Sequence, residues 1–149
     1  MKNYLKLLFA IFGFALIYAF NYSSKSKVSL TVNVADLKNN QGVVQFALYN
    51  KAGSIPDENY KQYYKMKKVE IHNKSATITF DNLTPGVYAV NILHDENKNG
   101  KIDKGWVLPV EGIGFSNYES IGLTNRPNFS KASFELKKST EINVKVIYM

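Results

Sequence analysis

The sequence contains no cysteine, and Arg126 is its only arginine. Without cysteine the chain has neither a disulfide framework nor a thiolate metal site. The formal net charge of +7 comes almost wholly from lysines, which are scattered along the chain. Nucleic-acid binders usually gather positive charge on one stripe and favour arginine for base and phosphate contacts. We therefore expect a solvated lysine surface and no nucleic-acid partner.

The sequence also lacks an apolar run of the roughly 20 residues that a bilayer-spanning helix needs. Its longest run extends from Leu7 to Phe20 and follows two lysines. A run of about 14 residues behind a basic flank matches the core of a signal peptide. The cleavage signal around Ala19 is weak, so an uncleaved anchor is the alternative. We assign residues 1–20 to a signal peptide or N-terminal membrane anchor and residues 21–27 to a linker, and we expect an exported protein that is periplasmic, secreted or membrane-tethered.

No long helical period follows this leader. Apolar and polar residues alternate instead, which is typical of half-buried strands. Strands are predicted in seven segments, residues 28–34, 43–50, 68–72, 76–80, 83–94, 132–137 and 141–148. Because no helix is long enough to cross between parallel strands, the pattern predicts an all-β fold over residues 28–149. We expect an antiparallel two-sheet β-sandwich of about seven strands, a Greek key similar to immunoglobulin and transthyretin domains.

The segment "LTPGVY" places a turn directly before a predicted strand whose first aromatic residue is Tyr88. This arrangement resembles the tyrosine corner of Greek-key sandwiches, in which the phenol bonds back to the backbone of the preceding connection. The alternative is a simple turn followed by a packed tyrosine.

The segment "DENKNGKID", residues 95–103, places acidic and amide residues at every second position; we call it the Asx loop. This spacing lets oxygen atoms converge on a calcium ion, and Gly100 stands where a calcium loop turns sharply. The predicted ligands are the side chains of Asp95, Asn97, Asn99 and Asp103 and the backbone carbonyl of Lys101. Trp106 occupies the position of the usual bidentate glutamate, so this is no EF-hand, and Glu111 is the candidate that replaces it. The alternative is a polar hairpin whose side chains satisfy their own backbone.

Three ordered motifs resemble the DUF2141 family, exported bacterial proteins without assigned function. The family pattern P-G-x-Y-A-x-x-x-x-H-D-x-N-x-N-G-K-x-D is matched by residues 85–103, and further matches lie in "LPVEGIGFSN" and "PNFSKASFEL". Val107 stands where the family usually has glycine. The resemblance implies an extracytoplasmic sandwich and brings no activity with it.

The connection over residues 105–130 is far longer than the usual 4–6 residues, so we expect it to be functional or held by a ligand. Its aromatic residues Trp106, Phe115 and Tyr118 are candidates for stacking on a sugar or peptide. The alternative is that they pack as a lid over the end of the sandwich. We expect the partner to be a carbohydrate or protein of the cell envelope.

His94, Asp103 and Glu111 are the candidates for acid–base catalysis, and an extracytoplasmic hydrolase is the alternative function. However, His94 lies on the apolar face of a predicted strand, where a packed and hydrogen-bonded histidine is the simpler interpretation. Ser116 has no G-x-S-x-G setting that would mark it as a nucleophile. We therefore expect a binding or structural module with a calcium-stabilised loop.

Overall fold

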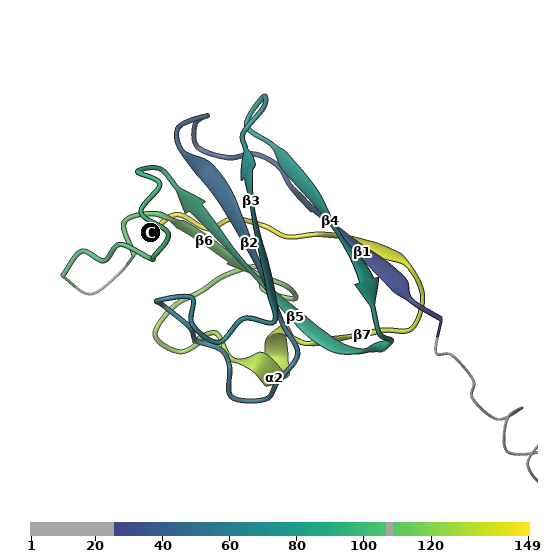
Figure 1. Cartoon of the computed structure of the whole chain (residues 1–149). Helices are drawn as coiled ribbons and strands as arrows, with labels where there is room; N and C mark the ends of the chain where they lie inside the picture. The colour runs from purple at the N-terminus through teal and green to yellow at the C-terminus, as the bar shows by residue number, and fades with distance from the viewer. Residues whose placement is uncertain (1–25, 107–108) are drawn as a thin grey trace, which may run out of the picture.

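The structure is a computed structural model that describes residues 26–106 and 109–149 (Figure 1). Eight strands and one short helix make up this part of the chain: β1 Val28–Val34, β2 Val43–Tyr49, β3 Lys65–Glu70, β4 Ala76–Leu83, β5 Gly86–Asp95, β6 Gly112–Phe115, α2 Phe129–Ala132, β7 Phe134–Leu136 and β8 Thr140–Asn143. The predicted leader, residues 1–20, lies outside the described residues. No helix within the described ranges is long and apolar enough to cross a membrane.

The strands form two sheets, as predicted. One has the order β4-β1-β8; the other has the order β3-β2-β5-β6, with β7 also paired to β5. The prediction of uniformly antiparallel strands is wrong for one pair, because β1 and β8 run parallel. A crossover helix between them is unnecessary, since the chain passes through the whole of the other sheet before it returns as β8.

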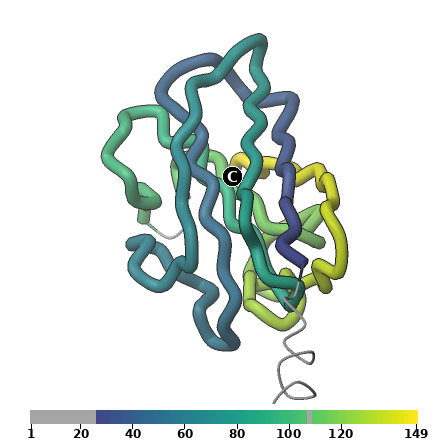
Figure 2. Tube along the Cα trace, turned by 45° about the vertical axis from the view of Figure 1, so that its right-hand side comes forward, coloured from purple at the N-terminus to yellow at the C-terminus, as the bar shows by residue number. Residues whose placement is uncertain are grey.

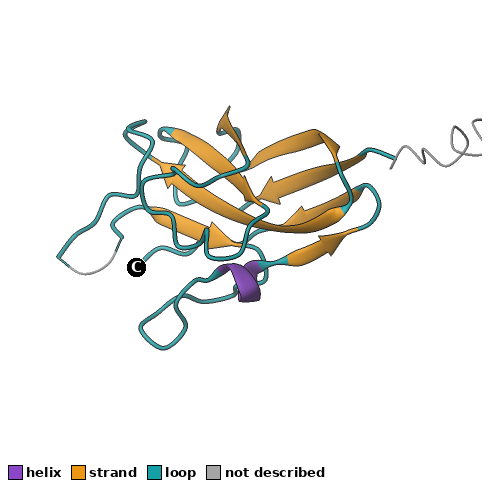
Figure 3. Cartoon of the chain, turned by 60° about the horizontal axis from the view of Figure 1, so that its bottom comes forward, coloured by secondary structure: helices purple, strands orange, loops and turns teal. Residues whose placement is uncertain are grey.

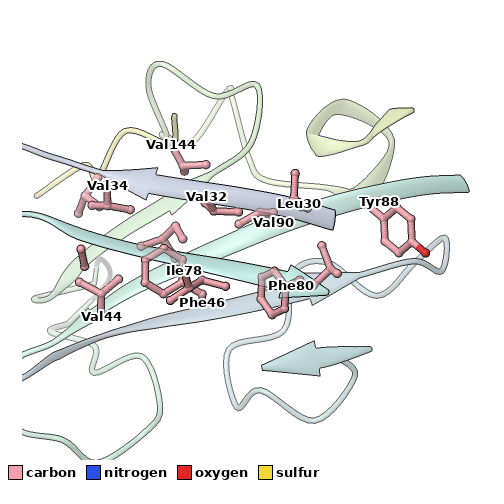
Figure 4. Close-up of a cluster of buried hydrophobic side chains, with 14 of the residues drawn as sticks. Leu30, Val32, Val34, Val44, Phe46, Ile78, Phe80, Tyr88, Val90 and Val144 are labelled. Carbon is pink, nitrogen blue, oxygen red and sulfur yellow. The ribbon is translucent and has the colours of Figure 1, made fainter. Parts of the chain in front are cut away.

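The core lies between the two sheets (Figure 4). Val32 and Phe80 face it from the three-stranded sheet, and Phe46 and Val90 face it from the five-stranded sheet. Each of these four side chains is fully buried. The alternation in the sequence therefore predicts the inner face of both sheets correctly, because successive side chains of a strand point to opposite faces.

The predicted tyrosine corner is confirmed. The Tyr88 hydroxyl donates a 2.7 Å hydrogen bond to the backbone carbonyl of Thr84, in the turn that precedes β5. This bond fixes the start of β5, whose other end carries Asp95.

The strand β6 was not predicted, because Gly112 and Gly114 leave its inner face without side chains. An added Cβ at Gly112 would lie 2.4 Å from the ring of Tyr148, and one at Gly114 would lie 2.4 Å from the carbonyl of Lys145. The C-terminal segment therefore fills the space where inward side chains of β6 would stand. A single backbone bridge, Ile113 to Ile147, holds it there.

The five-stranded sheet has a second hydrophobic cluster on its outer face. Residues 50–64 and 116–133, which we call the cover, include the helix α2 (purple in Figure 3) and pack on Ala47, Tyr49 and Leu93. Ile55, Tyr60, Tyr118 and Ala132 are the buried members that the cover contributes. The strands β2 and β5 of this sheet are therefore buried on both faces.

The connection after β1 and the turn after β3 lie together at one end of the molecule, where the Leu37 N–H donates to the Lys74 carbonyl at 3.0 Å. The chain enters β1 from the opposite end (Figure 2). Because Asp95 pairs with Val43 at the start of β2, the Asx loop leaves the sheet at the first end, away from the start of β1.

Candidate functional site

Asp95 begins the Asx loop and is fully buried. Its Oδ1 accepts a 2.9 Å hydrogen bond from the Asn99 N–H, and its Oδ2 accepts one of 2.8 Å from the Gly100 N–H. The ammonium group of Lys68, on β3, lies 3.7 Å from Oδ2. This carboxylate therefore folds the first turn of the loop back on the end of β5.

The amide side chains of Asn97 and Asn99 converge on one oxygen of Asp103. Their Nδ2 atoms donate to Asp103 Oδ2 at 2.6 and 2.7 Å. Their Oδ1 atoms accept from the backbone N–H groups of Asn99 and Lys101, both at 3.0 Å. The side chains at alternating positions thus meet through their amide nitrogens, and their amide oxygens accept from the backbone of the loop itself.

Glu111 joins the two ends of the segment. Its Oε1 accepts from the Glu96 N–H at 3.1 Å, and its Oε2 accepts from the Asp103 N–H at 3.2 Å. Burial raises the pKa of the Glu111 carboxyl above its ordinary value, and the nearby charges of Asp103 and Asp95 add to this shift although the two hydrogen bonds oppose it. Glu111 is therefore brought to the loop, as predicted, and carries a charge that its surroundings disfavour.

The donor set suits a hard cation. Carboxylate, amide and carbonyl oxygens are the ligands that calcium prefers. In the described part of the chain, no three carboxylate or imidazole groups come close enough to hold a metal by themselves. A cation here would therefore also need the amide oxygens of Asn97 and Asn99 and the Lys101 carbonyl. The same hydrogen bonds also fit the polar hairpin that is the alternative.

Gln45 is a polar residue of the site that the sequence did not reveal. Its side chain is fully buried beneath the loop, and its Nε2 donates to the Gly100 carbonyl at 3.4 Å. Its Oε1 has no hydrogen-bond partner among the described residues. The alternation of β2 places Gln45 on the outer face, where a solvated glutamine is expected, and only the fold shows that the loop covers it.

The three aromatic candidates do not share one surface. Phe115 and Tyr118 are buried in the second cluster, with ring centroids 5.9 Å apart, and the Tyr118 hydroxyl donates to the Arg126 carbonyl at 3.1 Å. Trp106 is fully exposed. The packing of Phe115 and Tyr118 fits the lid that is the alternative to stacking, and of the three only Trp106 is exposed.

The structure does not join His94 to the carboxylates. His94 is fully buried on the inner face of β5, with Nδ1 2.7 Å from the Tyr148 hydroxyl and Nε2 2.9 Å from the Gln41 carbonyl. Within residues 26–106 and 109–149, no hydrogen bond connects it to Asp103 or Glu111. This geometry fits a packed, hydrogen-bonded histidine.

A groove of about 360 Å³ lies beside the Asx loop, over β6. Its walls are mostly apolar, with a few charged residues. The lining residues are Pro56, Glu58, Ile102, Lys104, Pro109, Ile113, Phe115, Ile121, Gly122, Leu123, Arg126, Pro127 and Met149. The cover, the segment at the end of the Asx loop and β6 all contribute lining residues.

The fold and the loop define a small two-sheet β protein with an oxygen-rich loop at one end. Residues 32–143 match the model of a family described as "Uncharacterized protein conserved in bacteria (DUF2141)". The chain belongs to this family, as the motifs predicted. No curated protein and no solved structure shows a significant match.

Proposed function

We propose that this chain is an exported binding module of the bacterial cell envelope, a Greek-key sandwich whose Asx loop is stabilised by calcium. The ligands are the side chains of Asp95, Asn97, Asn99, Asp103 and Glu111 and the carbonyl of Lys101. The observation that supports the proposal is the placement of Glu111, whose two carboxylate oxygens accept from the N–H groups of Glu96 and Asp103 at 3.1 and 3.2 Å and so bring a third carboxylate to the loop of Asp95 and Asp103.

The charge distribution favours a cation at this position. Asp95, Asp103 and Glu111 bring three carboxylates to one loop, and the nearest ammonium group is that of Lys68, 3.7 Å from Asp95. The pKa of Glu111 is raised, first by burial and then by the other two carboxylates. A divalent ion would neutralise this mutual repulsion, which a single partly exposed lysine does only in part.

Calcium would act structurally. Ordering a long connection has a conformational entropy cost for each residue that it fixes. An ion held by both Asp95 at the end of β5 and Glu111 before β6 would offset that cost, because metal binding to the folded state adds to folding free energy. The segment between them would then form a stable wall of the neighbouring groove.

The test is a thermal melt of the chelated protein with added calcium or magnesium. At a calcium concentration 100 times the dissociation constant, binding stabilises the fold by about 2.7 kcal/mol. We expect the melting temperature to rise with calcium and the rise to disappear in Asp103→Asn. The matched control is Asp81→Asn, which removes an exposed carboxylate from β4. Equal rises in both variants, or no rise at millimolar calcium, would refute the calcium loop.

Export has its own test. Export depends on residues 1–20. Mass spectrometry of the native N-terminus separates a cleaved, secreted protein from a tethered one. A chain that begins at Met1 and stays in the cytosol would refute this part of the proposal.

A further inference from the structure

The groove has the size of a small-molecule site. Pockets of about 300–1,000 Å³ with mostly apolar walls and a few polar groups are typical of such sites. The groove's volume of about 360 Å³ is at the lower end of that range. A stable protein–protein interface instead needs about 800 Å² from each partner, so the groove fits a small molecule better than a folded domain.

Two exposed apolar side chains line this groove, and two more are close to its lining residues in the chain. Seven large hydrophobic residues are exposed in the described part of the chain. Leu123 and Met149 line the groove, and Trp106 and Val110 lie beside its lining residues Lys104 and Pro109 in the chain. Contiguous exposed apolar surface with a polar rim marks interaction sites in soluble domains.

The charges at the rim favour an anion. Lys104 and Glu58 form an ion pair of 2.6 Å across one side, and these two charges offset each other. Arg126 also lines the groove, and no carboxylate of the described residues is within 4 Å of its guanidinium group. A guanidinium group binds a carboxylate through two parallel hydrogen bonds.

We propose that the groove binds one small amphiphilic carboxylate, of the fatty-acid class, with its hydrocarbon part on Ile113, Ile121 and Leu123 and its carboxylate on Arg126. This deepens the proposed function, because it names the ligand class of the binding module. The Asx loop continues into one wall through Ile102 and Lys104, so calcium would strengthen binding. The ligand chemistry itself is set by the groove residues.

The experiment is a fluorescence titration of the full chain with decanoate. Decanol, which has the same chain length but no charge, is the control ligand. Trp106 is the only tryptophan, it is exposed, and it follows the lining residue Lys104 by two positions in the chain, so its emission is the probe of occupancy. We expect saturable binding of decanoate. Arg126→Gln should weaken it about ten-fold, since it removes a charged hydrogen-bond partner, and should leave decanol unchanged. Leu123→Glu should abolish binding of both.

Val87→Ser is the matched control, because Val87 is an exposed hydrophobic residue of β5 that does not line the groove. All variants share residues 1–27, so any binding to that apolar segment cancels between them. Equal losses in Val87→Ser and Leu123→Glu would overturn the proposal, as would unchanged decanoate binding in Arg126→Gln. Self-association without decanoate binding would also overturn it and identify the apolar surface as a dimer contact.

A repeat in chelator separates the two proposals. Decanoate binding that persists when calcium has no effect on melting supports the groove and refutes the calcium loop. A calcium-dependent melt with no decanoate binding, in calcium or chelator, supports the loop and refutes the groove ligand.

Discussion

The two sheets differ in what covers their outer faces. Along β1 buried and half-buried residues alternate strictly, whereas all seven residues of β2 are buried. The outer face of the three-stranded sheet is polar, with the hydroxyls of Thr31 and Thr79 2.9 Å apart across the strands. The outer face of the five-stranded sheet instead packs against the cover. In the part of the chain that the structure describes, the three-stranded sheet therefore has no further layer on its outer side. The five-stranded sheet carries a third layer, made of loops and the short helix α2.

The third layer holds the polar chemistry of the molecule. Tyr49 donates to Asp57 at 3.2 Å, and Tyr60 donates to Asn91 at 3.4 Å, all four side chains being buried. Burial raises the pKa of both tyrosines, and the charge of Asp57 adds to the shift. Irregular segments leave many backbone and side-chain groups without ladder partners, and these two buried pairs, the groove and the Asx loop all belong to this side of the sheet.

The largest expected effect is on the shared core. Phe46 is fully buried between the sheets, and Phe46→Ala should lower the free energy of unfolding by about 4 kcal/mol through lost burial and a cavity. Denaturant titration measures it, and both sheets should unfold in one transition because both contact this side chain. Two separate transitions would show that the sheets do not share a cooperative core.

A smaller effect should come from the cover. Asp57 accepts from the backbone N–H groups of Lys61 and Gln62 at 3.0 and 2.7 Å as well as from Tyr49. Asp57→Ala should destabilise the protein by about 2 kcal/mol, since it leaves the buried Tyr49 hydroxyl without an acceptor. Hydrogen exchange should speed up in residues 54–62 and stay slow in β1 and β4. Uniform acceleration would mean that the cover and sandwich unfold together.

The contrast between the sheets also explains what the sequence could predict. Inner faces follow a period of two, so β1, β2, β4 and β5 were recognised. The strand β6 escaped, because Gly112 and Gly114 give it no side chains on its inner face and residues far along the chain fill the space. The parallel pairing of β1 with β8 escaped too, since it depends on the path of the whole chain.

The site was predictable only where its residues are close in sequence. The spacing of Asp95, Asn97 and Asn99 indicated a loop that folds on itself. In the structure Asp95 accepts from the Asn99 backbone, and the side chains of Asn97 and Asn99 donate to Asp103. Gln45 and the groove were not foreseen, because both depend on which coil covers the outer face of the sheet. A local pattern carries no information about such distant segments.

The pH dependence of stability tests the charge of the Asx loop. The pKa of Glu111 is raised above 4.5 in the folded protein. Just above pH 4.5 the folded state therefore keeps the Glu111 proton, whereas the unfolded state has lost it. The stability that this proton contributes is complete below pH 4.5 and disappears as the pH rises through the folded pKa. In chelator, Glu111→Gln should remove this decline, which urea midpoints at successive pH values would show. An identical decline in the variant would mean that another group causes it.

The smallest effect should come from the outer face of the three-stranded sheet. Thr31 is half-buried there and makes one side-chain hydrogen bond, to Thr79. In Thr31→Val the remaining hydroxyl can turn to water, and valine suits a strand, so the free energy of unfolding should change by less than about 0.5 kcal/mol. Thermal melts of wild type and variant measure the difference. A loss comparable to that of Asp57→Ala would mean that this face is also covered, and the distinction between a two-layer and a three-layer side would fail.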